Sequence, residues 1–196
     1  MDYETEDFRH AAALLREHTA WLDIRDAIEA IDRAAILDKQ RELASRGRAP
    51  RGGQSALNGL FEDLLPEPAW IQQPRLFEGA ELRKWKMDFL CDRVGVEVSF
   101  NHAEAIPWQF TRLNIAGESE RVIPESRIDV GVVITATDSL KAWSRMDSAV
   151  GTFDAFRSWL REMKPILPVP ILLIGLRATG WPATDVFGGT RSGTRS

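Results

Sequence analysis

The stretch Lys86–Phe100, KMDFLCDRVGVEVSF, predicts two short strands that meet in a tight turn at Asp92 and Arg93. Apolar and polar residues alternate along both halves, which is the pattern of a β-sheet with one buried face. Antiparallel pairing around that turn places Asp88 directly opposite Glu97, although a one-residue bulge would shift this pairing and Asp-Arg is not the favoured Asn-Gly type of turn. The sequence therefore predicts a hairpin that brings two carboxylates together on its polar face.

Two carboxylates directly across a strand pair repel each other, so this arrangement requires a cation between them or full solvation. Oxygen ligands of this kind suit Mg²⁺, which keeps several waters and also binds phosphate. A bound Mg²⁺ polarises a phosphodiester and lowers the pKa of an attacking water. The hairpin therefore has two interpretations: a metal-dependent phosphodiesterase site, or an edge hairpin whose polar face lies in water.

The same pairing places Lys86 on the face of Asp88 and opposite Ser99. Lys86 is therefore a candidate catalytic cation, and the alternative is a solvated strand lysine. If Lys86 is catalytic, we expect Lys86→Ala to reduce cleavage far more than DNA binding.

The spacing of apolar residues predicts the rest of the fold. The expected elements are helices over 6–45, 57–64, 108–117 and 152–164 and strands over 70–77, 128–137 and 169–176. Their order predicts a mixed α/β core over residues 51–180. We expect a helical region over 1–50 packed on or extending that core, and a flexible tail over 181–196, which is rich in Gly, Ser, Thr and Arg.

Length and composition exclude several classes of protein. A chain of 196 residues with a formal net charge of -4 has the size of one domain and does not have a basic surface throughout, although a local basic cleft would not change that total. Cys91 is the only cysteine, which excludes internal disulfides and thiolate zinc sites and favours a reducing cytoplasm. The acidic N-terminus lacks the features of a signal peptide, and the longest apolar run is about half as long as a membrane helix. We therefore expect a cytoplasmic protein without a membrane anchor.

The segment MDFLCDRVGVEVSFNH, residues 87–102, resembles the type II restriction endonucleases of the BglII and BstYI family, within the PD-(D/E)XK superfamily. The likeness continues through 128–137, 145–156 and 168–176 and covers roughly residues 52–177. It implies a restriction-endonuclease-like fold, in which a mixed central β-sheet is flanked by α-helices. It also implies Mg²⁺-dependent hydrolysis of double-stranded DNA at a short palindromic site that leaves 5'-phosphates, by a homodimer paired in function with a DNA methyltransferase.

The resemblance also assigns roles within the hairpin. Asp88 and Glu97 match the metal-binding carboxylates, and the carbonyl of Val98 matches an additional ligand. Ser99 stands where the family has Gln, and a serine is too short to replace it and cannot supply a cation, which puts the positioning of the attacking water in question. Glu62 resembles an acidic residue that some superfamily members bring to the site from a preceding helix; the alternative is a surface glutamate.

DNA contacts are expected from loops at the mouth of the site and from basic residues. The candidates are Asn101 and His102 after the second strand, Lys141, Arg145 and Ser148 in a later loop, and Arg48 and Arg51 in a basic segment. Turn capping, an ordinary surface position and a basic linker are the respective alternatives.

Two other functions remain open at this point. A DNA-binding protein that has kept the nuclease fold but lost cleavage is favoured by Ser99. A structure-specific repair nuclease of the same superfamily would nick DNA without a fixed sequence.

Overall fold

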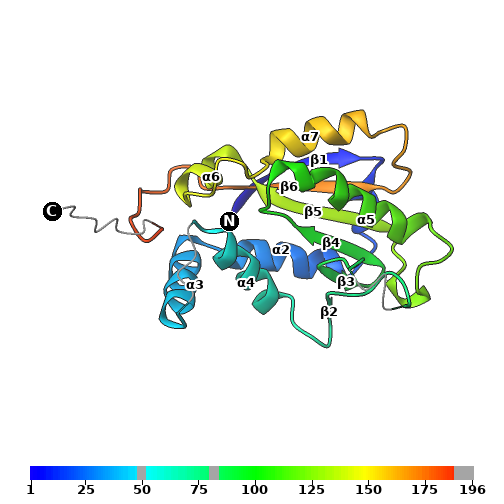
Figure 1. The fold of residues 1–196 in the computed structure, drawn as a ribbon, viewed down its shortest axis with the longest axis horizontal. Helices are drawn as coiled ribbons and strands as arrows, with labels where there is room; N and C mark the ends of the chain where they lie inside the picture. Colours follow the sequence, from blue (N-terminus) through cyan, green and yellow to red (C-terminus); the bar gives the residue numbers. More distant parts are fainter. Residues whose placement is uncertain (48–51, 80–83, 188–196) are drawn as a thin grey trace.

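The computed structural model describes residues 1–47, 52–79 and 84–187. Six strands within these residues form one sheet in the order β1-β6-β5-β4-β3-β2 (Figure 1). The strands are β1 Asp2–Phe8, β2 Ile71–Gln72, β3 Phe89–Cys91, β4 Val94–Val98, β5 Val130–Ala136 and β6 Ile171–Arg177. The helices are α1 Ala11–Leu15, α2 Ala20–Ala30, α3 Arg33–Ser45, α4 Gln54–Leu64, α5 Ile106–Glu118, α6 Asp138–Trp143 and α7 Phe153–Glu162, with 3-10 turns η1 Ala103–Ala105 and η2 Pro124–Ser126. The predicted mixed α/β architecture is confirmed.

Three parallel strands form the centre of the sheet. β4 pairs with β5 and β5 with β6, both in parallel, and every residue of β4 and β5 is buried. Parallel strands require long crossovers, which here contain α5 between β4 and β5 and α7 between β5 and β6. Burial on both faces explains why the sequence of β5 is a continuous apolar run.

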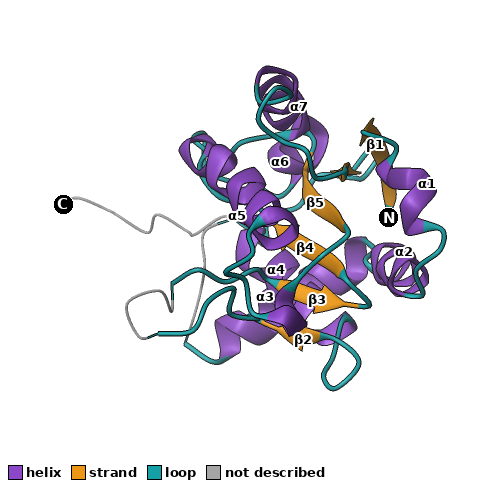
Figure 2. Ribbon diagram, turned by 90° about the vertical axis from the view of Figure 1, so that its right-hand side faces the viewer, coloured by secondary structure: helices purple, strands orange, loops and turns teal. Residues whose placement is uncertain are grey.

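Helices cover both faces of the sheet and create two apolar cores (Figure 2). On one face, residues of α1 to α4 pack on Val94, Val96 and Val98 of β4. On the other face, α5 and α7 pack on β5 and β6, with Phe110 and Phe156 in edge-to-face contact. Alternate residues of β4 therefore face different helical layers, which decides where Glu97 points.

The hairpin of β3 and β4 has the predicted register. Phe89 pairs with Val96 and Cys91 with Val94, which leaves Asp92 and Arg93 as the turn. Both turn residues have positive φ, 47° and 59°, as a two-residue type I′ hairpin requires. This conformation is uncommon for residues other than glycine.

Contacts with neighbouring elements stabilise this turn. The Asp92 carboxylate accepts a hydrogen bond from the backbone N–H of Thr19, and the Arg93 side chain pairs with Asp129 at the start of β5. Tertiary contacts therefore offset an unfavourable turn sequence.

The predicted position of Lys86 opposite Ser99 is wrong, because the first strand leaves β4 at Asp88. Lys86 bridges instead to Arg75, and the backbone N–H of Met87 donates to Pro74. The Met87 side chain lies on the face of the hairpin opposite to the one that strict alternation predicts. There its sulfur is so close to Gly95 that a Cβ on that glycine would be 2.9 Å away. A prediction from the alternation of polar and apolar residues does not reveal that the first strand separates from β4 at Asp88.

The N-terminal region is not wholly helical, which corrects the prediction for residues 1–50. Residues 2–8 form the edge strand β1, antiparallel to β6 from Asp2–Arg177 to Phe8–Ile171. Helices α1, α2 and α3 follow as expected. The strand is acidic, and all its residues except Phe8 are exposed or half-buried, as suits a sheet edge.

Residues of the predicted C-terminal tail contact the core as far as 187. Trp181 contacts Trp143 edge to face, and Phe187 is 4% exposed within the core. Residues 188–196 lie outside the described residues. In the described part of the chain, no helix has the length and apolar character needed to cross a membrane.

Candidate active site

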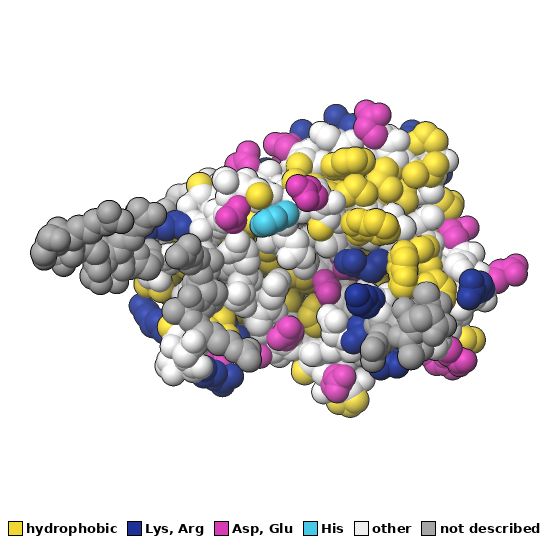
Figure 3. All heavy atoms as spheres, viewed as in Figure 1, with side chains coloured by type: hydrophobic (Ala, Val, Ile, Leu, Met, Phe, Trp, Pro, Cys, Tyr) yellow, Lys and Arg dark blue, Asp and Glu magenta, His cyan; other side chains and the backbone are white. Residues whose placement is uncertain are grey.

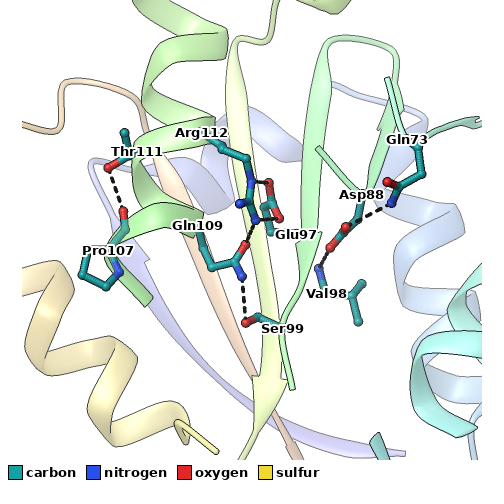
Figure 4. A network of polar contacts seen from close by, with 9 residues as sticks. All are labelled: Gln73, Asp88, Glu97, Val98, Ser99, Pro107, Gln109, Thr111 and Arg112. Atoms are coloured by element: carbon teal, nitrogen blue, oxygen red, sulfur yellow. Dashed lines mark hydrogen bonds and ion pairs between the residues drawn. The ribbon is translucent and has the colours of Figure 1, made fainter. Parts of the chain in front are cut away.

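Asp88 lies at the point where the first strand of the hairpin separates from β4. Its Oδ2 accepts a hydrogen bond from the backbone N–H of Val98 at 2.9 Å, and its Oδ1 accepts one from Gln73 Nε2 at 3.3 Å (Figure 4). The Asp88 carboxylate thus accepts the hydrogen bond that a backbone carbonyl would accept if the first strand continued beside β4. Burial raises the pKa of Asp88, and the N–H of Val98 and the charge of Arg112 partly offset this.

Glu97 is fully buried on β4 and points toward α5. Its two carboxylate oxygens accept hydrogen bonds from Arg112 Nε and Nη2, each at 2.7 Å. Burial raises the pKa of Glu97 to about 8; the Arg112 hydrogen bonds act against this shift, and the negative charge of Asp88 adds to it. The buried carboxylate therefore has a protein cation as its direct partner.

Sequence reasoning missed Arg112, although it predicted that a cation must accompany the two carboxylates. Arg112 lies on α5, and Gln109, one helical turn earlier, accepts a hydrogen bond from its Nη2. Gln109 and Arg112 lie next to the buried apolar residues of the same helix, Ile106, Phe110 and Leu113. Polar residues next to the apolar stripe of a predicted helix were the available signal.

Ser99 does not reach open space. It is 1% exposed, and its Oγ accepts a hydrogen bond from Gln109 Nε2 at 3.1 Å. Gln109 thus links Ser99 to Arg112, and the end of β4 is joined to α5 by an amide (Figure 4).

A cavity of about 210 Å³ opens beside Asp88. Its lining residues are Asn58, Glu62, Gln72, Gln73, Asp88, Phe89, Val98, Asn101, Gln109 and Arg112. Glu62 therefore lines this cavity together with Asp88, whereas Lys86 does not. Asn58 lies one helical turn before Glu62 on α4, and sequence reasoning did not select it.

The donor set of the cavity is suited to a hard cation. The described residues contain no group of three or more His, Cys, Asp and Glu side chains that could hold a metal ion. However, the Oδ1 of Asn58 is buried and has no hydrogen-bond partner among the described residues, so it can accept a hydrogen bond from a metal-bound water. Together with the carboxylate of Asp88 it fits Mg²⁺, which takes oxygen ligands and retains water.

Comparison with protein families then identifies the chain. The family described as Restriction endonuclease BglII/BglIII matches residues 3–176. The chain belongs to this family. Membership in the BglII/BglIII family makes it an enzyme of the type II site-specific deoxyribonuclease class.

Solved structures of BglII confirm the restriction-endonuclease-like fold expected for this family. A crystal structure of restriction endonuclease BglII complexed with a DNA 16-mer matches with a TM-score of 0.68 at 17% identity, covering 90% of this chain and 77% of that one. A crystal structure of free BglII matches with a TM-score of 0.58 at 17% identity, covering 90% and 79%. No curated protein sequence matches this member of the BglII/BglIII family significantly.

Two of the loops predicted to contact DNA lie side by side in this BglII/BglIII family member. The backbone N–H of Gly151 donates to the carbonyl of Asn101 at 3.0 Å, and His102 bridges to Val150. Asn101 also lines the cavity, and Ser148 is exposed in the neighbouring loop. Sequence reasoning named both loops but not their contact.

The basic candidates are distributed differently. Lys141 Nζ donates to the carbonyls of Ser148 and Val150, at 2.8 and 2.6 Å, so it holds the second loop in shape. Arg145 is exposed and pairs with Asp185. Arg48 and Arg51 lie outside the described residues.

Proposed function

We propose that this chain is a Mg²⁺-dependent type II restriction endonuclease that hydrolyses double-stranded DNA at a short palindromic site and leaves 5'-phosphates. The observation that carries the proposal is the placement of Asp88 at a cavity that also holds an unpartnered oxygen, with Glu97 buried behind Arg112, in a chain of the BglII/BglIII family. The related BglII forms a complex with a DNA 16-mer, which supports DNA as the substrate of this chain.

Asp88 is the proposed primary metal ligand, together with the carbonyl of Val98. Because the N–H of Val98 points toward Asp88, the carbonyl of the same strand residue points to the same side. Glu97 completes the set: Arg112 uses one lone pair on each of its oxygens, and an ionised carboxylate has two on each. Asn58 and Glu62 are placed to hold metal-bound water from α4.

Bound Mg²⁺ would polarise the scissile phosphodiester and lower the pKa of the attacking water. The residues of the chain then have simple tasks. Asp88 and Glu97 would hold the ion, Gln73 orients the Asp88 carboxylate, and the loop of Asn101 and His102 would contact the DNA.

We propose a homodimer because the described residues of one chain form one such cavity, whereas cleavage of both DNA strands requires two active sites. Hydrophobic side chains gather on the surface over α5 and α7 (Figure 3), where Trp108 is 57% exposed and Trp159 43%. Exposed aromatic residues of this kind are enriched at protein interfaces. We also propose a DNA methyltransferase as the functional counterpart in the cell, where the enzyme would act in the cytoplasm.

Supercoiled plasmid tests the proposal. With Mg²⁺ we expect discrete linear fragments carrying 5'-phosphates, and with EDTA or with Asp88→Asn we expect none. The matched control is Asp26→Asn, which changes an aspartate of α2 outside the cavity and is expected to cut like the parent. Nicking without discrete fragments would favour the structure-specific nuclease instead.

A DNA-binding protein without cleavage is the second candidate. The observation that favours it is that no lysine lines the cavity among the described residues and that Ser99 is buried. In the same assay this function would give retarded plasmid and no cutting at any Mg²⁺ concentration.

A further inference from the structure

Arg112 is the only cation that lines the cavity in the described part of the chain. The two hairpin positions considered for a catalytic cation do not provide one at the cavity: Ser99 is a buried neutral residue, and Lys86 bridges to Arg75. A site that accepts a phosphodiester needs positive charge or hydrogen-bond donors aimed at the phosphate oxygens. The position of Arg112 makes it the candidate.

The guanidinium of Arg112 is fixed before any ligand arrives. Nε and Nη2 donate to Glu97, and Nη2 also donates to Gln109. Gln109 is in turn held by Ser99, at 3.1 Å. A donor that is already oriented loses little entropy when it binds, and Arg matches the geometry of phosphate oxygens.

One part of the guanidinium remains available. Nη1 makes no hydrogen bond with the described residues, while the Arg112 side chain is 23% exposed and borders the cavity. Arg112 therefore has one edge on the buried carboxylate and another with donors directed away from it.

The charge around the cavity is consistent with this arrangement. Asp88 and Glu62 are the acidic side chains that line the cavity, and Arg112 is paired with the buried Glu97 behind it. The two negative charges that remain equal the positive charge of one divalent cation. A phosphate would then meet two positive groups, the ion and Arg112, rather than a net negative surface.

We propose that Arg112 is a catalytic residue that donates from Nη1 to a non-bridging oxygen of the scissile phosphate. It takes the charge-stabilising role that Ser99 cannot fill. This inference rests on the proposed function, since it deepens the account of the same site.

Deoxyadenosine 5'-monophosphate, a product-like probe, tests the contact without cleavage. Its binding at saturating Mg²⁺ is measured by ³¹P NMR titration, after the Mg²⁺ affinity of each variant has been measured separately by calorimetry. Arg112→Gln is expected to bind the nucleotide about 10-fold more weakly and to cleave plasmid about 100-fold more slowly. Arg127→Ala, which removes an arginine outside this cavity, is the matched control and is expected to change neither.

Arg112→Lys guards against misfolding, because it keeps a cation beside Glu97. Its single ammonium is expected to remain on Glu97, so nucleotide binding should fall about 10-fold here too. Guanidinium ion at non-denaturing concentration should restore binding to a folded Arg112→Ala chain. Folded Arg112 variants that bind the nucleotide like the parent would overturn the proposal, as would slower cleavage with unchanged nucleotide binding.

Failure of the phosphate contact and failure of the endonuclease function give different results. If the parent protein binds the nucleotide through Arg112 but never cuts DNA, the contact stands and the endonuclease function fails. If the parent cuts DNA while Arg112→Gln retains full binding and rate, the function stands and the contact fails.

Discussion

At the scale of single residues, the bidentate pair between Arg112 and Glu97 dominates the energetics of the site. Removing one partner of a buried pair is costly because it leaves the other charge without compensation. We expect Arg112→Met to lower the free energy of unfolding, and to lower it more as the pH rises above 8, because loss of the guanidinium raises the pKa of the buried Glu97 further and its ionised form then has no partner. Urea unfolding followed by circular dichroism measures this change.

The double variant Arg112→Met with Glu97→Gln is the control. It has no buried charge at these two positions, so most of the lost stability should return. Equal stability of the single and double variants would show that Glu97 is not an uncompensated charge when Arg112 is removed.

At the scale of elements, the connection between the hairpin turn and β5 predicts a dependence on pH. Hydrogen bonds from Arg93 hold the pKa of Asp129 below its ordinary value of 3.8. A lowered pKa in the folded state adds stability above the ordinary value, and that stability is lost as the pH falls through the folded-state pKa. Asp129→Asn should therefore be less stable than the parent at pH 7 and should approach the parent as the pH drops below about 4.

The size of this effect is limited by solvent. The Arg93 and Asp129 side chains are 52% and 47% exposed, so the expected difference at pH 7 is about 1 kcal/mol or less. Urea midpoints measured from pH 7 to pH 3 give the result, and repeating them in about 1 M NaCl, where the Debye length falls to about 3 Å, should shrink the difference. A difference that grows toward low pH would contradict the assignment.

Elements also show what a sequence can and cannot predict. The hairpin register follows from alternation and a two-residue turn, which are local, and it is confirmed from Phe89 to Val96. The break at Asp88 depends on competing pairing with residues 73–76, which is a long-range choice. Likewise, β1 is a strand because β6 offers it an edge, and nothing local in residues 2–8 reveals that edge.

The candidate site follows the same division. Asp88 and Glu97 could be selected from spacing, since a strand pair fixes which residues face each other. Arg112, Gln109 and Asn58 come from helices whose orientation toward the hairpin depends on packing, so a position beside an apolar stripe marks them only as candidates and does not place them at the hairpin.

At the scale of the whole molecule, metal binding should stabilise the fold. A ligand that binds only the folded state adds about 2.7 kcal/mol at about a hundred times its dissociation constant. We expect Mg²⁺ to raise the unfolding temperature of the parent in a concentration-dependent way and to have little effect on Asp88→Asn. Differential scanning fluorimetry with EDTA reversal measures this, and an equal shift in both proteins would remove Asp88 from the metal site.

The proposed dimer predicts a specific product from mixed subunits. If each subunit cuts one strand, a dimer of one parent chain and one Asp88→Asn chain retains a single working cavity. Such dimers, purified through two different affinity tags after co-expression, should convert supercoiled plasmid to nicked circles and make linear DNA only slowly. Parent dimers prepared in the same way should give linear DNA directly, because two cavities act on opposite strands at one palindromic site. If the mixed dimers form linear DNA at the parent rate, one cavity cuts both strands. If no doubly tagged protein is recovered, the chain acts without a stable partner.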